Sequence, residues 1–264
     1  MEHEALIRLA IFLGLFAILA SAEAVFPRRT RHQSRQSRWF ANWGLVLIDT
    51  LALRLVALLI PALAAGASLD AGAQGWGLFN ALDWPLWLEF LLAVLIFDFA
   101  IWAQHLITHK IPVLWRLHRV HHADRDMDVT TAIRFHPVEI ALSMGLKIGL
   151  VYLIGPSVFA IVVFEILLNG TAMFNHANLR LPLGVDRLLR MVLVTPDMHR
   201  VHHSVHRHEH DSNYGFSLSL WDRLFGTYIA QPEKGHDEMT VGLEWQDERP
   251  AKLGWLLALP FFRK

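Results

Sequence analysis

The pentapeptide HRVHH occurs twice in this chain, at residues 118–122 and again at residues 199–203. In a helix, residues three and four positions apart project from one face, so each copy can direct three imidazole rings into one cavity. His105 and His109 have the same helical spacing, and His176 lies between the two copies. Neutral imidazole is a common ligand of iron, zinc and copper. The pattern therefore predicts a metal centre with enough ligands for two ions.

The alternative interpretation places these histidines on solvated helix faces, where they would serve only charge and solubility. Solvated faces rarely repeat one residue type at ligand spacing, and a single HxxxH pair would have been weak evidence. Three clusters, two of them with the HxxHH form, favour the metal centre.

The composition is that of a membrane protein. Hydrophobic residues make up 54% of the 264 residues and charged residues only 18%, which is more apolar than a soluble domain. The formal net charge is zero, so no nucleic-acid partner is indicated. The chain has no cysteine, which excludes disulfides, thiolate ligands and iron–sulfur clusters.

Four apolar regions predict the membrane segments. Those at Ala5 to Phe26, Leu45 to Ala65 and Leu86 to Ala103 are each near the ~20 residues that a spanning helix needs. The fourth, from Val138 to Leu168, is interrupted by Gly155-Pro156 and predicts a helical hairpin. The first region lacks the basic start of a signal peptide, so we expect a retained helix.

The arginines predict the orientation. Five of them lie between Pro27 and Arg38, whereas the connection from Gly66 to Pro85 has no Lys or Arg. The positive-inside rule then places the first connection in the cytoplasm. Tracing the helices from there brings all three histidine clusters to the cytoplasmic side.

Several other polar residues are candidates for supporting the centre. Asp98 shares a helical stripe with His105 and His109, and Glu165 and Asn169 share one with His176. Either acid can accept the second ring N–H of a ligand histidine. The alternative, which is equally open, is that they pair with polar partners inside the bundle.

Four further histidines have expected roles other than metal binding. His136 precedes Pro137, a position typical of a helix N-cap, which we favour over a metal ligand. His206, His208 and His210 lie in a polar run that reads as an exposed, solvated loop.

A set of motifs in fixed order resembles the fatty acid hydroxylase and sterol desaturase superfamily of integral membrane di-metal oxygenases. The resemblance covers about residues 98–228 and rests on HLITH (His105–His109), HRVHH (His118–His122), HPVE (His136–Glu139), NHAN (Asn175–Asn178), TPDMHRVHH (Thr195–His203), NYG (Asn213–Gly215) and WDRLFGTY (Trp221–Tyr228). It implies an all-α membrane protein with about four transmembrane helices and a cytosolic helical cap. It also implies a di-iron centre that uses O2 to hydroxylate or desaturate a lipid.

The resemblance carries ligand roles onto nine residues, namely His105, His109, His118, His121, His122, His176, His199, His202 and His203. Fatty acid hydroxylases place a further histidine one turn before the position of His176, where this chain has Ala172. The coordination shell is therefore expected to be one ligand short. The HPVE and NHAN motifs look closer to bacterial sterol-desaturase-like members.

We expect one membrane domain over residues 1–264. Residues 1–104 would form the N-terminal transmembrane helices, and residues 105–264 the histidine-cluster catalytic region with its membrane hairpin at 138–170. The apolar tail from Leu253 to Phe262 is too short to span, so it is expected at the interface or on the cap.

The expected cofactors are two iron ions, which zinc can replace during purification. The substrate would be a lipid from a bacterial inner membrane. The chain shows no flavin, NAD or cytochrome fingerprint, so electrons would come from a separate ferredoxin- or cytochrome-like donor with its reductase. Arg116, Arg119, Arg125 and Arg134 would form its basic docking surface.

Two other functions remain open at this stage. A zinc-dependent membrane hydrolase would use a metal-bound water, but an imidazole-only ligand set fits most hydrolytic zinc sites poorly. A non-catalytic metal-binding or transport protein would have midplane sites and repeats, which the sequence does not indicate. Oxygen consumption coupled to lipid oxidation would distinguish the oxygenase from both.

Overall fold

The computed structural model describes residues 4–59, 63–82 and 84–262. Regular structure in these ranges is helical, and strand pairing is limited to isolated bridges. Four helices are long and apolar enough to cross a membrane, namely α1 (Glu4–Val25), α5 (Leu86–Lys110), α7 (Pro137–Ile154) and α8 (Val158–His176). The all-α membrane architecture expected from the sequence is therefore confirmed.

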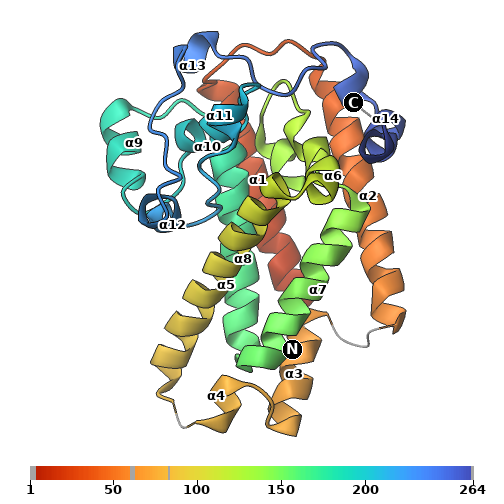
Figure 1. Ribbon diagram of the computed structural model, residues 1–264, viewed down its shortest axis with the longest axis vertical. Coiled ribbons are helices and arrows are strands. Elements are labelled where there is room, and N and C mark those ends of the chain that lie inside the picture. Colours follow the sequence, from red (N-terminus) through yellow and green to blue (C-terminus); the bar gives the residue numbers. More distant parts are fainter. Residues whose placement is uncertain (1–3, 60–62, 83, 263–264) are drawn as a thin grey trace.

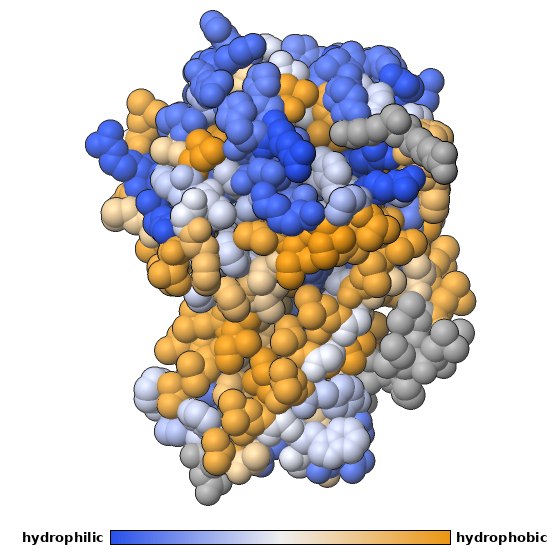
Figure 2. Space-filling model, viewed as in Figure 1, coloured by the Kyte–Doolittle hydropathy of each residue, from blue (hydrophilic) through white to orange (hydrophobic). Residues whose placement is uncertain are grey.

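The four helices form one end of the molecule, with the cap on the other (Figure 1). Their outer surface forms an apolar band below a hydrophilic cap (Figure 2). The hairpin predicted at Gly155-Pro156 is present as α7 and α8. Gly155 ends α7 with a φ of 68°, and a Cβ there would lie 2.5 Å from the Trp76 carbonyl oxygen, so this turn requires glycine.

The second predicted span differs from the structure. Helix α2 (Arg35–Leu59) begins ten residues earlier than expected, carries several charged side chains and is not among the candidate spans. A separate helix, α3 (Ala64–Gln74), follows, and residues 60–62 of the predicted segment lie outside the described residues. Pro61 is the physical reason for two helices, because proline disfavours the helical conformation of the residue before it.

The connection expected as a loop between residues 66 and 85 is also largely helical. It contains most of α3 and the short α4 (Leu78–Ala81). Ala64 and Ala67 of α3 and Phe79 of α4 pack into the same apolar cluster as the facing ends of α7 and α8. This cluster closes the end of the bundle that is opposite the cap.

The cap consists of short elements on top of the bundle. They are α6 (Pro112–His122), η1 (Val129–Ile133), α9 (Leu183–Leu189), α10 (Pro196–His202), α11 (Arg207–His210), α12 (Leu220–Leu224), α13 (Gly235–Glu238), η2 (Arg249–Ala251), α14 (Leu253–Ala258) and η3 (Leu259–Phe261). The apolar tail packs on the cap, where Leu256 and Leu259 are fully buried with Leu45 and Val120. The two HRVHH copies lie in α6 and α10.

A buried ion cluster ties α2 to the cap. The Arg38 guanidinium donates two hydrogen bonds of 2.8 Å to Asp124 and one of 2.6 Å to Asp128, and all three residues are fully buried. Burial alone would raise the pKa of Asp124, but Arg38 outweighs it and holds that pKa well below its usual range. Asp124 follows His122 by two residues, so the cluster fixes the end of α6 that carries the histidines.

We expect Asp124→Asn to destabilise the folded protein by about 3–5 kcal/mol, because breaking a buried pair leaves the Arg38 charge undercompensated. Thermal unfolding in detergent measures the effect. The matched control is Asp247→Asn, whose carboxylate pairs with Arg249 on the surface and should matter little. Equal melting temperatures for the two variants would contradict this role of the cluster.

Candidate metal centre

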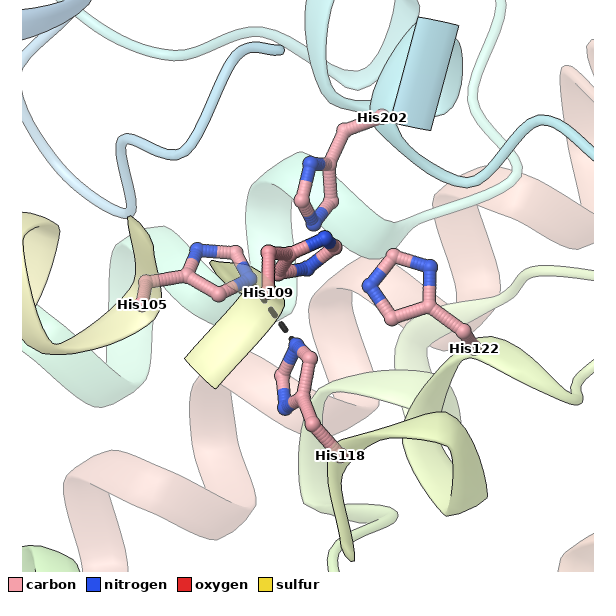
Figure 3. A group of neighbouring side chains, drawn as sticks. All are labelled: His105, His109, His118, His122 and His202. Atoms are coloured by element: carbon pink, nitrogen blue, oxygen red, sulfur yellow. Dashed lines mark hydrogen bonds between the residues drawn. The ribbon is translucent and has the colours of Figure 1, made fainter. Parts of the chain in front are cut away.

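The structure brings all nine predicted ligand histidines together in two groups. Within each group, the nitrogen atoms available to a metal lie within 4.8 Å of one another. The first group contains His105, His109, His118, His122 and His202, and the second contains His121, His176, His199 and His203. Figure 3 shows the rings of the first group converging from separate helices. The second group has one histidine fewer, and Ala172 lies one turn before its member His176.

Each HRVHH copy contributes to both groups. In α6, His118 and His122 belong to the first group and His121 to the second. In α10 the division is reversed, because His202 belongs to the first group and His199 and His203 to the second. The first and fifth residues of the motif share one face of the helix, and the fourth residue points in a different direction. One short motif can therefore provide ligands to two neighbouring sites.

Backbone carbonyl groups orient several of the rings. The Nδ1–H groups of His105, His202 and His176 donate to the carbonyl oxygens of Tyr214 (2.7 Å), Ser212 (2.6 Å) and Ala172 (2.7 Å), respectively. A hydrogen bond of this kind fixes the tautomer and leaves the Nε2 lone pair for a metal. The rings are therefore preorganised as ligands.

The distances between ring nitrogens fit a metal between them. The Nε2 atoms of His105 and His118 are 3.0 Å apart, and the Nε2 atom of His176 is 3.1 Å from that of His121 and 3.3 Å from that of His203. A histidine nitrogen bound to a metal ion lies about 2.0–2.1 Å from it. Two such nitrogens are therefore roughly 3 Å apart when the N–metal–N angle is near 90°, and a few tenths of an ångström farther apart when the site is tetrahedral. Both groups match this range.

The histidines are neutral in this environment. Burial lowers the pKa of His118 to about 3, and burial followed by neighbouring histidines lowers the pKa values of His122, His199 and His202 well below the usual range. Both ring nitrogens of His122 are buried without a hydrogen-bond partner in the described part of the chain. Unpartnered buried nitrogens are costly, and a bound cation removes that cost. The residues therefore fit a pair of metal ions.

Glu139 is a supporting residue that sequence reasoning did not identify. Its Oε1 atom accepts a hydrogen bond of 2.6 Å from Nδ1 of His118, and the carboxyl group is buried. This is the carboxylate–histidine contact that raises the basicity of a metal ligand. The HPVE motif, in which Glu139 is the last residue, was the available signal.

Asp98 does not contact a histidine of either group. Its carboxylate accepts a hydrogen bond of 2.8 Å from the indole of Trp221, and the indole of Trp102 on the same helix donates to Asp222 at 3.0 Å. Asp222 also accepts from the backbone N–H of Tyr214, whose carbonyl orients His105. These reciprocal bonds attach α12 to α5. Of the two alternatives left open for Asp98, its contacts are those of polar pairing inside the bundle.

The other predicted supporting residues also lie away from the ligand rings. Glu165 pairs with Lys147 and Arg8, which is the polar pairing left open as one of its two alternatives. Asn169 lines a cavity between the helices. The Nδ1 atom of His136 accepts a hydrogen bond from the Val138 N–H, which confirms the helix N-cap.

The polar run after the second HRVHH is not a wholly solvated loop. His206 and His208 lie toward the surface, but His210 is buried in α11 and stacks on Trp115 with ring centroids 5.2 Å apart. Trp115 in turn lies 4.8 Å from the His109 ring and 5.2 Å from the His122 ring. His210 therefore belongs to the surroundings of the first group.

Two cavities reach the first group from opposite directions. One, of about 180 Å³, lies among α5, α7 and α8 and is lined by His105 and His118. The other, of about 640 Å³, lies in the cap and is lined by His109, Trp115 and His210. The fold and the site together define a helical membrane protein with a buried, histidine-rich candidate metal centre.

Comparison with known proteins identifies the family. The sequence model of the fatty acid hydroxylase family matches residues 90–227, more than half of the chain. The chain is 35% identical to alkylglycerol monooxygenase of Xenopus tropicalis over 57% of its own length and 32% of that protein, so it spans about a third of that relative. It is 26% identical to ornithine lipid hydroxylase OlsE of Rhizobium tropici over 96% of its own length and 75% of that protein.

Human alkylglycerol monooxygenase is 33% identical over 61% of this chain and 35% of its own length. No solved structure matches the chain significantly. The chain belongs to the fatty acid hydroxylase family. The family resemblance drawn from the histidine motifs is therefore confirmed.

We expect His202→Ala and His121→Ala, one from each group, to reduce bound metal, because each removes an imidazole from a different ion. Elemental analysis of protein purified without added metal measures the metal per chain. His208→Ala is the matched control, since its ring lies on the surface and outside both groups. Full metal content in either group variant would contradict the assignment of that group.

We expect Glu139→Gln to weaken metal binding about 10- to 100-fold, the usual effect of removing the carboxylate behind a ligand histidine. Competition with a chelator of known affinity measures it. The exposed Glu238→Gln variant should bind as the wild type does. An unchanged affinity in Glu139→Gln would mean that Glu139 only fills space beside His118.

Proposed function

We propose that this protein is an O2-dependent di-iron hydroxylase of a membrane lipid. The observation that carries the proposal is the position of the first histidine group at the end of a cavity inside the membrane-spanning bundle. A reactive centre at that position meets chains that come from the bilayer. Iron is favoured because nitrogen-only ligand sets suit it and because oxygen insertion requires a redox-active metal.

The reaction balances when one oxygen atom enters a C–H bond and the other leaves as water, with two electrons and two protons supplied from outside. When bound, the two iron ions supply the activation of O2 that this chemistry requires. The chain supplies geometry. His105 and His118 face the cavity, Glu139 holds the Nδ1 proton of His118, and Phe135 and Leu168 line the cavity with apolar surface.

Hydroxylation is favoured over desaturation because the relatives reported above are named as a monooxygenase and a hydroxylase. A zinc hydrolase is disfavoured because neither histidine group includes a carboxylate, which most hydrolytic zinc sites use. Transport is disfavoured because the groups lie at the cap end of the bundle and not on broken helices at its middle.

We further propose that the cap faces the cytoplasm of a bacterial inner membrane. The arginine-rich connection between α1 and α2 lies on the cap side, and the connection between α2 and α5, at the other end, has no Lys or Arg. This is the asymmetry of the positive-inside rule. The histidine groups would then be accessible to cytoplasmic electron carriers.

The electron donor would be a separate acidic protein, ferredoxin- or cytochrome-like, that docks over the cap cavity. The basic residues that line that cavity are Lys110, Arg116, Arg119 and Arg207, beside the acidic Asp211 and Glu244. The docking surface expected from the sequence needs correction. Arg134 is fully buried and Arg119 is 2% exposed, because both donate to backbone carbonyls inside the cap. Trp115 lines the cavity and contacts His109 and His122, so it provides an aromatic connection from the docking surface to the first group.

We expect membranes that contain the iron-loaded protein and a reducing system to convert a host lipid into a product with one added oxygen atom. Heavy-isotope O2 and mass spectrometry of lipid extracts locate the source of that atom. His121→Ala and His202→Ala should abolish the product, because each removes a ligand that a di-iron centre needs, whereas His208→Ala should retain it.

Three outcomes distinguish the alternatives. Label from O2 in the product supports hydroxylation. A product that has lost two hydrogens, with no label, would replace hydroxylation by desaturation. A cleaved lipid that carries oxygen from water, formed without a reductant, would overturn the oxygenase proposal in favour of a zinc hydrolase.

A further inference from the structure

The membrane cavity contains an unusual number of polar side chains for a space that lies among membrane-spanning helices. Besides His105 and His118, it is lined by Gln104 from α5, Ser143 and Lys147 from α7, and Asn169 from α8. A cavity that accepted only a hydrocarbon chain would not need them, and ionisable groups at membrane depth are expensive and usually functional. These residues require a separate explanation.

The polar residues of α7 form a row along the cavity. Glu139, Ser143 and Lys147 are four residues apart and therefore share one face of the helix. Glu139 contacts His118 at the metal end, and the rise of a helix places Lys147 about 12 Å farther along the axis. Ser143 lies between them and donates to Gln104 at 3.2 Å. Lys147 thus marks the end of the cavity away from the histidines.

Lys147 keeps hydrogen-bonding capacity for a ligand. An ammonium group has three N–H donors, and in the structure one of them donates to Glu165 at 2.7 Å. Glu165 also pairs with Arg8, so its charge is shared between two cations. The Lys147 side chain is 12% exposed, and the exposed part lines the cavity. An apolar chain in this cavity would leave these donors unsatisfied.

The cavity is accessible from the bilayer. A smaller cavity of about 70 Å³ shares Gln104, Thr108 and Glu139 with it, and its other walls are leucines of α6 and α7. Two of these, Leu142 and Leu146, are 53% and 41% exposed on the surface that faces the membrane. Figure 2 shows a hollow in the apolar band with hydrophilic atoms at its base. The cavity of about 180 Å³ is smaller than most ligand pockets, so it holds one segment of a lipid while the rest stays in the bilayer.

We propose that Lys147 selects the substrate by donating a hydrogen bond to an oxygen of the lipid, which places the carbon to be oxidised toward the histidine end of the same cavity. The substrate class is therefore a lipid chain that carries an accepting oxygen, such as a carboxylate, carbonyl or hydroxyl, and not a plain hydrocarbon. This inference rests on the proposed function, since it deepens the specificity of the same centre. Lys147 is a specificity residue and does not touch the metal ligands.

Binding of three lipid probes of equal chain length tests the proposal without turnover. The probes are palmitic acid, hexadecanol and hexadecane, and native mass spectrometry of the metal-loaded protein in detergent gives their relative affinities. We expect the wild type to bind the acid and the alcohol at least about tenfold more tightly than the alkane, as a hydrogen bond to a charged group requires. Lys147→Met should bind all three with similar affinity.

Two further variants separate recognition from structure. Lys147→Met leaves Glu165 with Arg8 as its cationic partner, and the double variant Lys147→Met, Glu165→Gln removes the donor while keeping the net charge of the three groups unchanged. Lys147→Arg keeps the positive charge and the donors and should keep the preference. Lys234→Met, an exposed lysine in the cap, is the matched control.

The outcomes are distinct. The proposal is supported if the preference for oxygen-bearing probes disappears in the double variant and persists in Lys147→Arg. The ratio of the affinities for the acid and the alcohol tells whether the preferred oxygen is anionic. An unchanged preference in the folded double variant would overturn it and leave Lys147 as a packing ion pair. Binding is measured without O2 or electrons, so it does not depend on catalysis. A protein that prefers the oxygen-bearing probes but has no oxygenase activity would contradict the proposed function and leave the role of Lys147 in recognition intact.

Discussion

The burial of nine neutral imidazoles in one place is the constraint on which the rest of the structure depends. Each neutral ring has one nitrogen whose lone pair needs a hydrogen-bond donor or a metal ion. Most of the rings are fully buried, so water cannot supply that donor. Backbone carbonyls satisfy the outer nitrogens of some rings, such as those of His105 and His202. The inner nitrogens of the two groups face one another at distances that suit ligands of a bound cation.

That constraint explains why the cap has so many buried polar contacts for its size. A carbonyl can orient a ring only if its own segment is fixed, and the irregular NYG segment is fixed by Asp222, which accepts from two of its backbone N–H groups and from the Trp102 indole. In the same way, Arg38 fixes the segment that follows the first HRVHH through Asp124 and Asp128. The short elements of the cap thus support the rings through buried polar contacts as well as through their own apolar clusters.

The sequence predicted those features that depend on local spacing. The histidine groups follow from helical periodicity, the α7–α8 hairpin from its apolar run and Gly155-Pro156, and the spans α1 and α5 from hydropathy. It failed where the partner of a side chain lies far along the chain. Asp98 was equally compatible with a histidine or a tryptophan until α12 was placed beside α5, and Arg134 looked like a surface residue until its carbonyl partners were known. Pattern alone gives a residue's face on a helix, but tertiary packing decides what that face contacts.

The two cavities give the centre two separate approaches. The cap cavity reaches the first histidine group through His109, and the membrane cavity reaches it through His105 and His118, so different ligands of the same group face different surroundings. A hydrophilic carrier and a lipid can then reach the centre at the same time without sharing a path. This separation has a physical basis in the fold, because α5 contributes both His105 and His109, one turn apart, and the two rings line different cavities.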